Sequence, residues 1–313
     1  MFQYNAYGLA IGSDLALPAP PSNAGSVDVH IRVIGASPSP TQRSPIRCVS
    51  ASASATELYW GGVGRLLIEN GTLIQVVPDP HAEERALQLF VAGAGLGVLL
   101  SQRRLLVLHA SAVSVHGSAV AFAGGKGAGK STTTAVLCRG ANELLADELL
   151  VIAFDPSQGP VVLPGLAQLR LWHDALLASG YDRRTAKQVR TGIDKYAVDA
   201  ANIAPSPTPL RHVFLLDSGA KIGVERLSRP EAFLGLIGHI YVHRFGGEFL
   251  KRTGAAAPLQ QLGSLLEFAE PRRLTRTNDL GVLPDLMALV HKTIQSPENL
   301  GSCPETPAQA TAG

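Results

Sequence analysis

The stretch "AFAGGKGAGKSTTTAVLCRG", residues 121–140, decides the fold. An apolar strand enters it, a glycine-rich loop follows, and we predict a helix over 130–140 with its last glycine as the C-cap. The spacing G-x4-G-K-S, which begins at Gly124, satisfies the phosphate-binding loop (P-loop) pattern in full. A strand, such a loop and a helix in succession predict an α/β protein built around a turn that holds phosphate.

The loop has the chemistry of a nucleotide site. Glycines let backbone N–H groups point at phosphate oxygens, and the helix N-terminus adds partial positive charge. Lys130 would bridge the β- and γ-phosphates of ATP, and the Ser131 hydroxyl would ligate Mg²⁺. A glycine-rich turn that binds no nucleotide is the alternative. The predicted phosphate-binding residues are Gly124, Gly125, Lys126, Gly127, Ala128, Gly129, Lys130, Ser131 and Thr132.

Two adjacent acids follow the helix. "LLADELL" places Asp147 and Glu148 in an apolar strand predicted over 143–154, and Asp147 comes 17 positions after Lys130. That distance accommodates one helix, one turn and the next strand, so the acids should return to the mouth of the loop. Neighbouring carboxylates in an apolar run are costly unless a cation or a hydroxyl faces them. Mg²⁺ and a substrate hydroxyl are the expected partners, and a strand end in solvent is the alternative.

Other nucleotide-binding classes are tested by their motifs. The sequence contains neither the Asn-Lys-x-Asp of GTPases nor the Leu-Ser-Gly-Gly-Gln of ABC-type ATPases. The apolar "HVFLLD" ends at Asp217, which would serve as the metal-side acid of a generic ATPase or regulatory nucleotide-binding module. That interpretation stays open, as does a small-molecule kinase.

The composition limits the partners. A formal charge of +2 creates no field that would attract nucleic acid or an anionic membrane surface. Three cysteines far apart in the chain argue against a disulfide framework or a zinc site, and the N-terminus has no secretory pattern, so we predict a cytoplasmic protein. The apolar stretch 86–100 is shorter than the roughly 18 residues that span a bilayer, so we predict a buried core helix and no membrane partner.

The chain divides into three predicted regions: a mostly-β N-terminal region (1–80), a P-loop catalytic domain (81–295) and a disordered tail (296–313). In the first we predict a strand over 27–35 and a hairpin over 65–77 around Asn-Gly. Further predicted elements are a helix over about 80–103, strands over 104–115, 118–124 and 210–217, and helices near 229–243, 258–268 and 283–295.

The stretch "LHASAVSVHGSAVAFAGGKGAGKST … RGANELLADELL" resembles the catalytic core of the HPr kinase/phosphorylase superfamily. That family has a strand beginning with His-Gly or His-Ala, a phosphate loop fifteen residues later, and Ala-Asp-Asp after one helix. His109 to Gly124 matches the first spacing, and Ala146-Asp147-Glu148 matches the acids with Glu as the second. The chain resembles most the stand-alone relatives of this family, in the stretches "YNAYGLAIGSDLALP", "VLHAS" and "LRLW". Some of these relatives are encoded beside ribosomally made peptides, including lasso peptides, and phosphorylate a serine of the precursor peptide.

The resemblance implies an α/β fold of HPr-kinase type, a mixed sheet with flanking helices, and an ATP-dependent serine kinase acting on a peptide or small protein. It implies that Asp147 is the base that takes the proton from the acceptor serine, while Lys130 stabilises charge on the transferred phosphoryl. His109 matches the family's active-site histidine. Taken alone, a histidine in an apolar strand is equally a buried core residue.

One motif departs from the family. The family's Glu-x-Arg-Gly motif corresponds to Gln168-Leu169-Arg170-Leu171 in this chain. The chain keeps the arginine of the motif and lacks its metal-binding carboxylate. Glu148 is the candidate replacement as metal ligand, and phosphorylase activity is not expected. Arg170 and Lys195 are candidates to contact phosphate or the acceptor, with an exposed arginine at a helix start as the alternative. The basic tract 243–252 is predicted to be a flexible loop near the acceptor groove, with an ordinary solvated loop as the alternative. The oligomeric state stays open.

Overall fold

The computed structural model describes residues 1–23, 25–36 and 44–295. An N-terminal sheet of seven strands comes first, in the order β1-β2-β3-β7-β6-β5-β4. Its strands are β1 (Phe2–Ala6), β2 (Leu9–Ser13), β3 (Val29–Val33), β4 (Arg47–Ala51), β5 (Ala55–Trp60), β6 (Gly64–Glu69) and β7 (Leu73–Pro78). Asn70 (φ 55°) and Gly71 (φ 64°) join β6 to β7, which confirms the predicted hairpin, because two consecutive left-handed residues make its tight turn.

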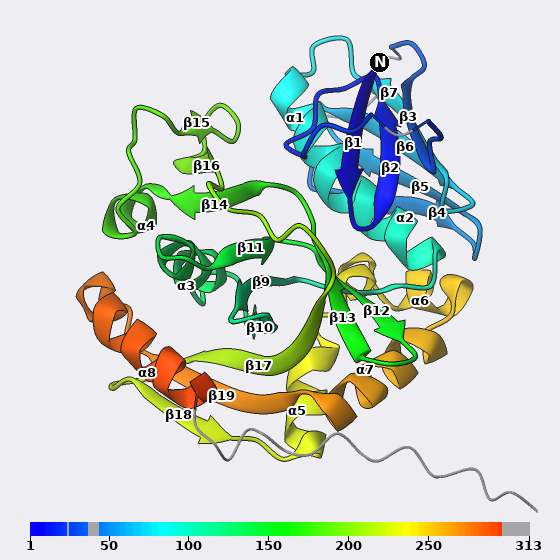
Figure 1. Cartoon of the computed structure of the whole chain (residues 1–313). Helices are drawn as coiled ribbons and strands as arrows, with labels where there is room; N and C mark the ends of the chain where they lie inside the picture. Colours follow the sequence, from blue (N-terminus) through cyan, green and yellow to red (C-terminus); the bar gives the residue numbers. More distant parts are fainter. Residues whose placement is uncertain (24, 37–43, 296–313) are drawn as a thin grey trace, which may run out of the picture.

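One helical run packs against this sheet: α1 (Glu84–Phe90), the π-helical turn η1 (Val91–Gly95) and α2 (Leu96–Gln102). A Cβ added to Gly95 would lie 3.1 Å from Leu66 Cδ1, so glycine lets the sheet approach the helix closely. The 19 residues of this run are long and apolar enough to cross a membrane, so the prediction that the apolar stretch is too short to do so is wrong. In this structure, however, 72% of its most apolar window is buried inside the protein. Figure 1 shows the run, in cyan, beside the blue strands.

A second sheet follows the path β11-β9-β10-β17-β13-β12-β8, with β19 beside β17 and β18 beside β19. Within this sheet, strands β10, β17 and β19 run parallel to one another. The residues that come directly after each of these strands therefore gather at one edge of the sheet. The strands are β8 (Leu106–Leu108), β9 (Ala110–Val115), β10 (Ser118–Ala123), β11 (Glu143–Ala146), β12 (Leu150–Asp155), β13 (Gly159–Leu163), β17 (Thr208–Ser218), β18 (Gly223–Arg226) and β19 (Glu270–Arg276). The fold class is therefore mixed α/β.

Two neighbouring segments of the second sheet are interrupted at the same place, one at His109 and the other at residues 147–149, and we call this place the corner. The continuous strand predicted over 143–154 is wrong, because β11 ends before Asp147 and β12 begins after Leu149. The partner segment breaks at His109, between β8 and β9. Ala146 still pairs with Ala112 and Leu150 with Leu108, so the corner is where both acids leave the sheet.

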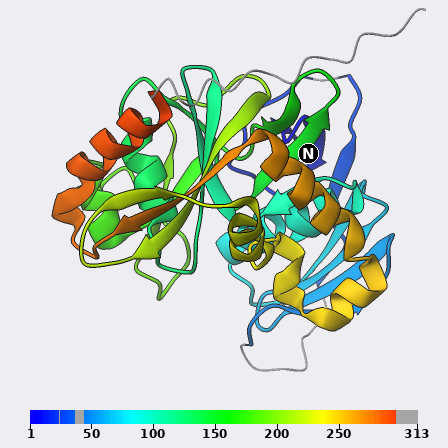
Figure 2. The same cartoon turned by 90° about the horizontal axis from the view of Figure 1, so that it is seen from below.

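Helices cover both faces of the second sheet. α3 (Lys130–Cys138) and α8 (Leu283–Gln295) pack on one face around Phe122 and Phe214. α5 (Arg229–Ile237), α6 (Gly247–Thr253) and α7 (Ala256–Phe268) belong to the other core, which they share with the N-terminal sheet. Figure 2 shows α8, in red-orange, on the opposite side from the yellow helices. A three-stranded sheet, β14 (Gln168–Trp172), β16 (Lys195–Asp199) and β15 (Lys187–Gln188), extends beyond α3 with α4 (His173–Ala178).

Three further expectations need correction or stay open. Arg139 is the C-cap of α3, with a right-handed φ of −70°, so the predicted cap at Gly140 is wrong. The basic tract 243–252 is the 3-10 helix η2 (Tyr241–Phe245) followed by α6 rather than a flexible loop. The predicted disordered tail, 296–313, lies outside the described residues, and the domain boundaries stay a prediction.

Candidate functional site

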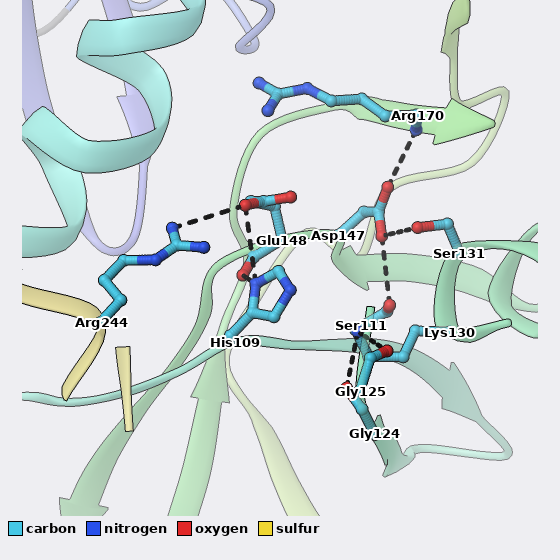
Figure 3. Close-up of polar contacts among 10 residues, drawn as sticks. All are labelled: His109, Ser111, Gly124, Gly125, Lys130, Ser131, Asp147, Glu148, Arg170 and Arg244. Atoms are coloured by element: carbon cyan, nitrogen blue, oxygen red, sulfur yellow. Dashed lines mark hydrogen bonds and ion pairs between the residues drawn. The ribbon is translucent and has the colours of Figure 1, made fainter. Parts of the chain in front are cut away.

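The glycine loop, residues 124–129, connects β10 to α3. Gly127 (φ 84°) and Gly129 (φ 94°) adopt the left-handed backbone that the turn requires and that glycine adopts without strain. Lys130 is buried, and its Nζ donates hydrogen bonds to the carbonyl oxygens of Gly124 (2.8 Å) and Gly125 (3.1 Å). The ammonium therefore lies across the loop, as Figure 3 shows.

The rest of the predicted phosphate-binding set lies around that ammonium. The central part of the loop, residues 125–127, is exposed to solvent, while Thr132 is buried in the first turn of α3. Burial lowers the pKa of Lys130, with Glu148 and Asp147 opposing that effect. A polyanion bound at the loop would add negative charge beside this ammonium and stabilise it.

Asp147 is held against the loop from three sides. Its Oδ1 accepts hydrogen bonds from Ser131 Oγ (2.8 Å) and Ser111 Oγ (3.1 Å), and its Oδ2 accepts one from the Arg170 backbone N–H (2.9 Å). The donors come from α3, β9 and β14, so the carboxylate ties three elements together. Ser131 and Asp147 together offer hard oxygen ligands of the kind that Mg²⁺ prefers.

Glu148 turns the other way, although it is the next residue. Its Oε1 lies 3.5 Å from His109 Nδ1 and 3.8 Å from Arg244 Nη1. The backbone of Glu148 has φ 81°, which is unusual for a residue with a side chain. Figure 3 shows the two carboxylates on different sides of the corner.

The electrostatics of Glu148 favour its ionised form. Burial alone raises the pKa of this carboxyl, but the interaction with His109 and the positive charges of Arg170, Lys195 and Arg244 outweigh burial and lower it. A carboxylate that remains charged beside a cavity can accept a proton or orient a hydroxyl.

His109 lies at the corner rather than inside a strand, and it contacts Glu148. Its Nδ1 is also 3.3 Å from the Glu148 carbonyl oxygen. Desolvation lowers the pKa of His109, so the ring is neutral near pH 7. Because both neighbours of Nδ1 are oxygens, the tautomer with the proton on Nδ1 fits this position.

Arg170 lies in the middle of β14, so the alternative of an exposed arginine at a helix start is wrong. Its backbone binds Asp147, while its side chain lines a pocket of about 880 Å³. Lys195 and Glu148 line the same pocket. Gln168, at the start of β14, donates from its amide to Asp199, and it does not join the acids at the loop.

Asp217 does not face the glycine loop. Its carboxylate is well exposed and pairs with Arg273 Nε at 3.7 Å, and Arg273 also pairs with Glu225 on β18. The carboxylate that contacts the serine of the loop is Asp147.

Arg276, which the sequence analysis missed, abuts the loop. It ends β19 and is 7% exposed, and a Cβ added to Gly129 would overlap its Nη1. Its Nε donates to the Thr277 carbonyl, but Nη1 is buried and finds no hydrogen-bond acceptor among the described residues. Burial lowers the pKa of this guanidinium. A buried, unsatisfied N–H beside the loop is a donor that an incoming anion would satisfy.

The residues fit Mg²⁺ and a nucleoside triphosphate. Within residues 1–23, 25–36 and 44–295 there is no cluster of three or more His, Cys, Asp or Glu that would hold a metal alone. Mg²⁺ at phosphates takes only one or two protein ligands and completes its shell with phosphate and water. The Ser131–Asp147 pair meets that requirement, and Arg276 and Lys130 would supply cations for the phosphates.

The comparisons give only a remote similarity. No family model and no curated protein matches the chain. Among solved structures, the HPr(Ser) kinase/phosphatase from Coxiella burnetii is similar over 60% of this chain and 95% of its own, at 13% sequence identity and a TM-score of 0.29. A similarity of this size is too distant to carry a functional conclusion, so function has to be inferred from the site.

Proposed function

We propose that the chain transfers the γ-phosphoryl group of ATP to a serine hydroxyl of a peptide or small protein. The observation that carries the proposal is the corner at Asp147 and Glu148. One of these acids contacts the serine of the glycine loop, and the other faces a pocket of about 880 Å³. A donor site and a cavity for an acceptor therefore adjoin at two consecutive residues.

The donor side is built from the loop and two cations. The backbone N–H groups of the loop and the start of α3 would hold the phosphates. Lys130 and Arg276 would stabilise charge on the transferred group. Mg²⁺, held by Ser131 and Asp147, would neutralise charge on the phosphates when bound.

On the acceptor side, the contacts favour an exchange of the roles predicted for the two acids. The resemblance implies Asp147 as the base, with Glu148 as the candidate metal ligand. Asp147, however, is hydrogen-bonded to the loop serine, whereas Glu148 lines the pocket through which an acceptor would come. We therefore propose Asp147 on the metal side and Glu148 as the base.

The proposed phosphoryl transfer needs no reactant besides ATP and the acceptor serine. The acceptor O–H proton passes to the Glu148 carboxylate, the serine oxygen forms a bond to the γ-phosphorus, and the bond from that phosphorus to the ADP oxygen breaks. His109, which contacts Glu148, would hold the carboxylate in position. Arg170 would fix Asp147 through its backbone N–H.

An array of serine peptides incubated with γ-labelled ATP and Mg²⁺ tests the proposal. We expect label on peptides with the wild-type chain and none with Lys130→Ala. Release of labelled phosphate without a labelled peptide would instead support an ATPase or regulatory module. Label confined to low-mass hydroxyl compounds in the same mixture would support a small-molecule kinase.

A further inference from the structure

The large pocket is enclosed by parts of the chain that are far apart in sequence. Trp60 comes from the end of β5, Gly93 from the π-helical turn, Arg190 from the loop after β15, and Phe245 from η2. Its volume of about 880 Å³ is within the range of sites that bury a compact ligand or a few residues of an extended peptide. Glu148, which directly follows Asp147, is one of its lining residues.

The lining is unbalanced in charge. It contains four arginine and lysine side chains against two glutamates. Glu148 interacts with Arg244, and Glu83 Oε2 accepts a backbone hydrogen bond from Thr191. Two of the cations, Arg170 and Lys195, make no side-chain hydrogen bond or ion pair with any described residue.

These two cations project from neighbouring strands. β14 and β16 are antiparallel, and Trp172 pairs with Lys195. Arg170 is two positions from Trp172, so Arg170 and Lys195 lie on the same face of the small sheet. That face contributes both residues to the pocket.

Arg190 adds a third cation to the lining. Its guanidinium carbon lies 5.4 Å from the centre of the Trp60 ring, and its Nε is buried without a hydrogen-bond acceptor in the part of the chain that the structure describes. A cation held over an indole, with a donor still unsatisfied, favours a bound carboxylate. The indole and the Phe245 ring would accommodate apolar side chains beside it.

From this lining we infer that the acceptor is an acidic peptide, with its serine hydroxyl at Glu148 and a carboxylate near the serine bound by Arg170, Lys195 and Arg190. The inference rests on the proposed function in assigning the pocket to the acceptor. The carboxylate comes from an aspartate or glutamate side chain, and a free C-terminus next to the serine would supply the same charge.

Peptides that differ only in charge test this inference. The set has one central serine with acidic, neutral or basic flanking residues, and both ends blocked. A further pair has the serine at the C-terminus, as the free acid or the amide. Alanine in place of the serine prevents transfer, so calorimetric titration of those peptides measures binding alone. The serine peptides with γ-labelled ATP measure transfer.

We expect the acidic peptide to bind at least about tenfold more tightly than the neutral one, and added salt to reduce the difference. Arg190→Gln and Lys195→Gln should each lower that ratio several-fold. Arg184→Gln is the matched control, because Arg184 is exposed outside the pocket and pairs with Asp182. Melting temperatures establish that the variants fold.

Equal binding of acidic and neutral peptides, no binding of any peptide, or an unchanged ratio in both pocket variants would overturn the inference. Acidic peptides that bind selectively but receive no label would support the acidic-peptide site in this pocket and refute the kinase. A preference for the free acid over the amide would identify the C-terminus as the source of the carboxylate.

Discussion

Ser131 Oγ donates a hydrogen bond of 2.8 Å to Asp147 Oδ1. The serine lies in the first turn of α3, and the aspartate directly follows β11, the next strand, so one helix, one turn and one strand return the acid to the loop. The next residue, Glu148, already belongs to the pocket. Two consecutive residues, Asp147 and Glu148, therefore belong to the proposed donor site and the proposed acceptor pocket.

Substitution of each acid separates their roles. Glu148→Gln should lower kcat by about 100-fold or more, because the proton acceptor is lost, while the Mg²⁺ concentration for half-maximal rate stays the same. Asp147→Asn should raise that Mg²⁺ concentration and weaken Mg²⁺–ATP binding, with the affinity for metal-free ADP unchanged. Steady-state kinetics at varied Mg²⁺ and calorimetry with ADP provide the measurements.

The opposite pattern would restore the roles predicted from sequence. If Asp147→Asn lost transfer without any change in Mg²⁺ dependence, Asp147 would be the base. Full activity in both variants would remove the corner from the mechanism altogether.

Replacement of Arg276 tests whether its guanidinium serves the ligand or the fold. Arg276→Met keeps most of the packing volume and removes a buried, partly unsatisfied charge, so the free protein should be no less stable. Stabilisation by ATP should fall, because each tenfold loss of affinity removes about 1.4 kcal/mol at saturating ligand. Thermal melting with and without ATP measures both quantities.

Arg273→Met is the control for that experiment, since Arg273 is on the same strand but pairs with Asp217 and Glu225 away from the loop. It should leave stabilisation by ATP unchanged. A less stable free Arg276→Met protein that responds normally to ATP would show that the arginine is structural.

Local patterns predicted what local interactions determine. The Asn70-Gly71 hairpin, the buried helical run and the strand–loop–helix at Gly124 follow from turn chemistry and hydrophobic periodicity, and the structure contains all three. The corner at Asp147 was missed because apolar residues flank the two acids of "ELLADELLVIAF" on both sides, and only the pairing with two successive strands divides this stretch.

The missed site residue has a related cause. β19 carries Arg272 and Arg276 on its buried side, which inverts the apolar alternation by which a strand is recognised. Arg276 reaches the loop only because β19 lies parallel to β17 and β17 to β10. No spacing of residues along the sequence predicts the contact between Arg276 and the glycine loop, so only the tertiary structure reveals it.

Two glycines at the ends of α3 should respond oppositely to alanine. Gly129→Ala introduces strain at φ 94° and a Cβ that overlaps Arg276, so nucleotide binding should be lost. Gly140 has no left-handed backbone, and its added Cβ would meet only the Leu137 carbonyl at 3.7 Å. Gly140→Ala should therefore be neutral or stabilising by up to about 1 kcal/mol. Urea unfolding and ATP titration of both variants check this, and a destabilised Gly140→Ala would indicate that the position caps the helix.

His212 should make stability fall as the solution becomes acidic. Burial, and then the charge of Arg272, lower the pKa of His212 to about 4, and Arg272 Nη1 lies 3.3 Å from its Nδ1. In the unfolded chain the pKa is about 6.5, so the unfolded state takes up the proton first. The stabilising contribution is therefore complete above pH 6.5 and is lost as the pH falls from there towards 4.

At pH 5 this loss should amount to about 2 kcal/mol relative to pH 7.5. Asparagine retains an oxygen that can accept from Arg272 and has no proton to gain, so His212→Asn should lose less stability over the same interval by about that amount. Urea unfolding of wild type and variant at the two pH values gives the comparison. Other buried histidines contribute equally to both proteins and cancel. An identical loss in the two proteins would mean that His212 accepts its proton in the folded state as readily as in the unfolded chain.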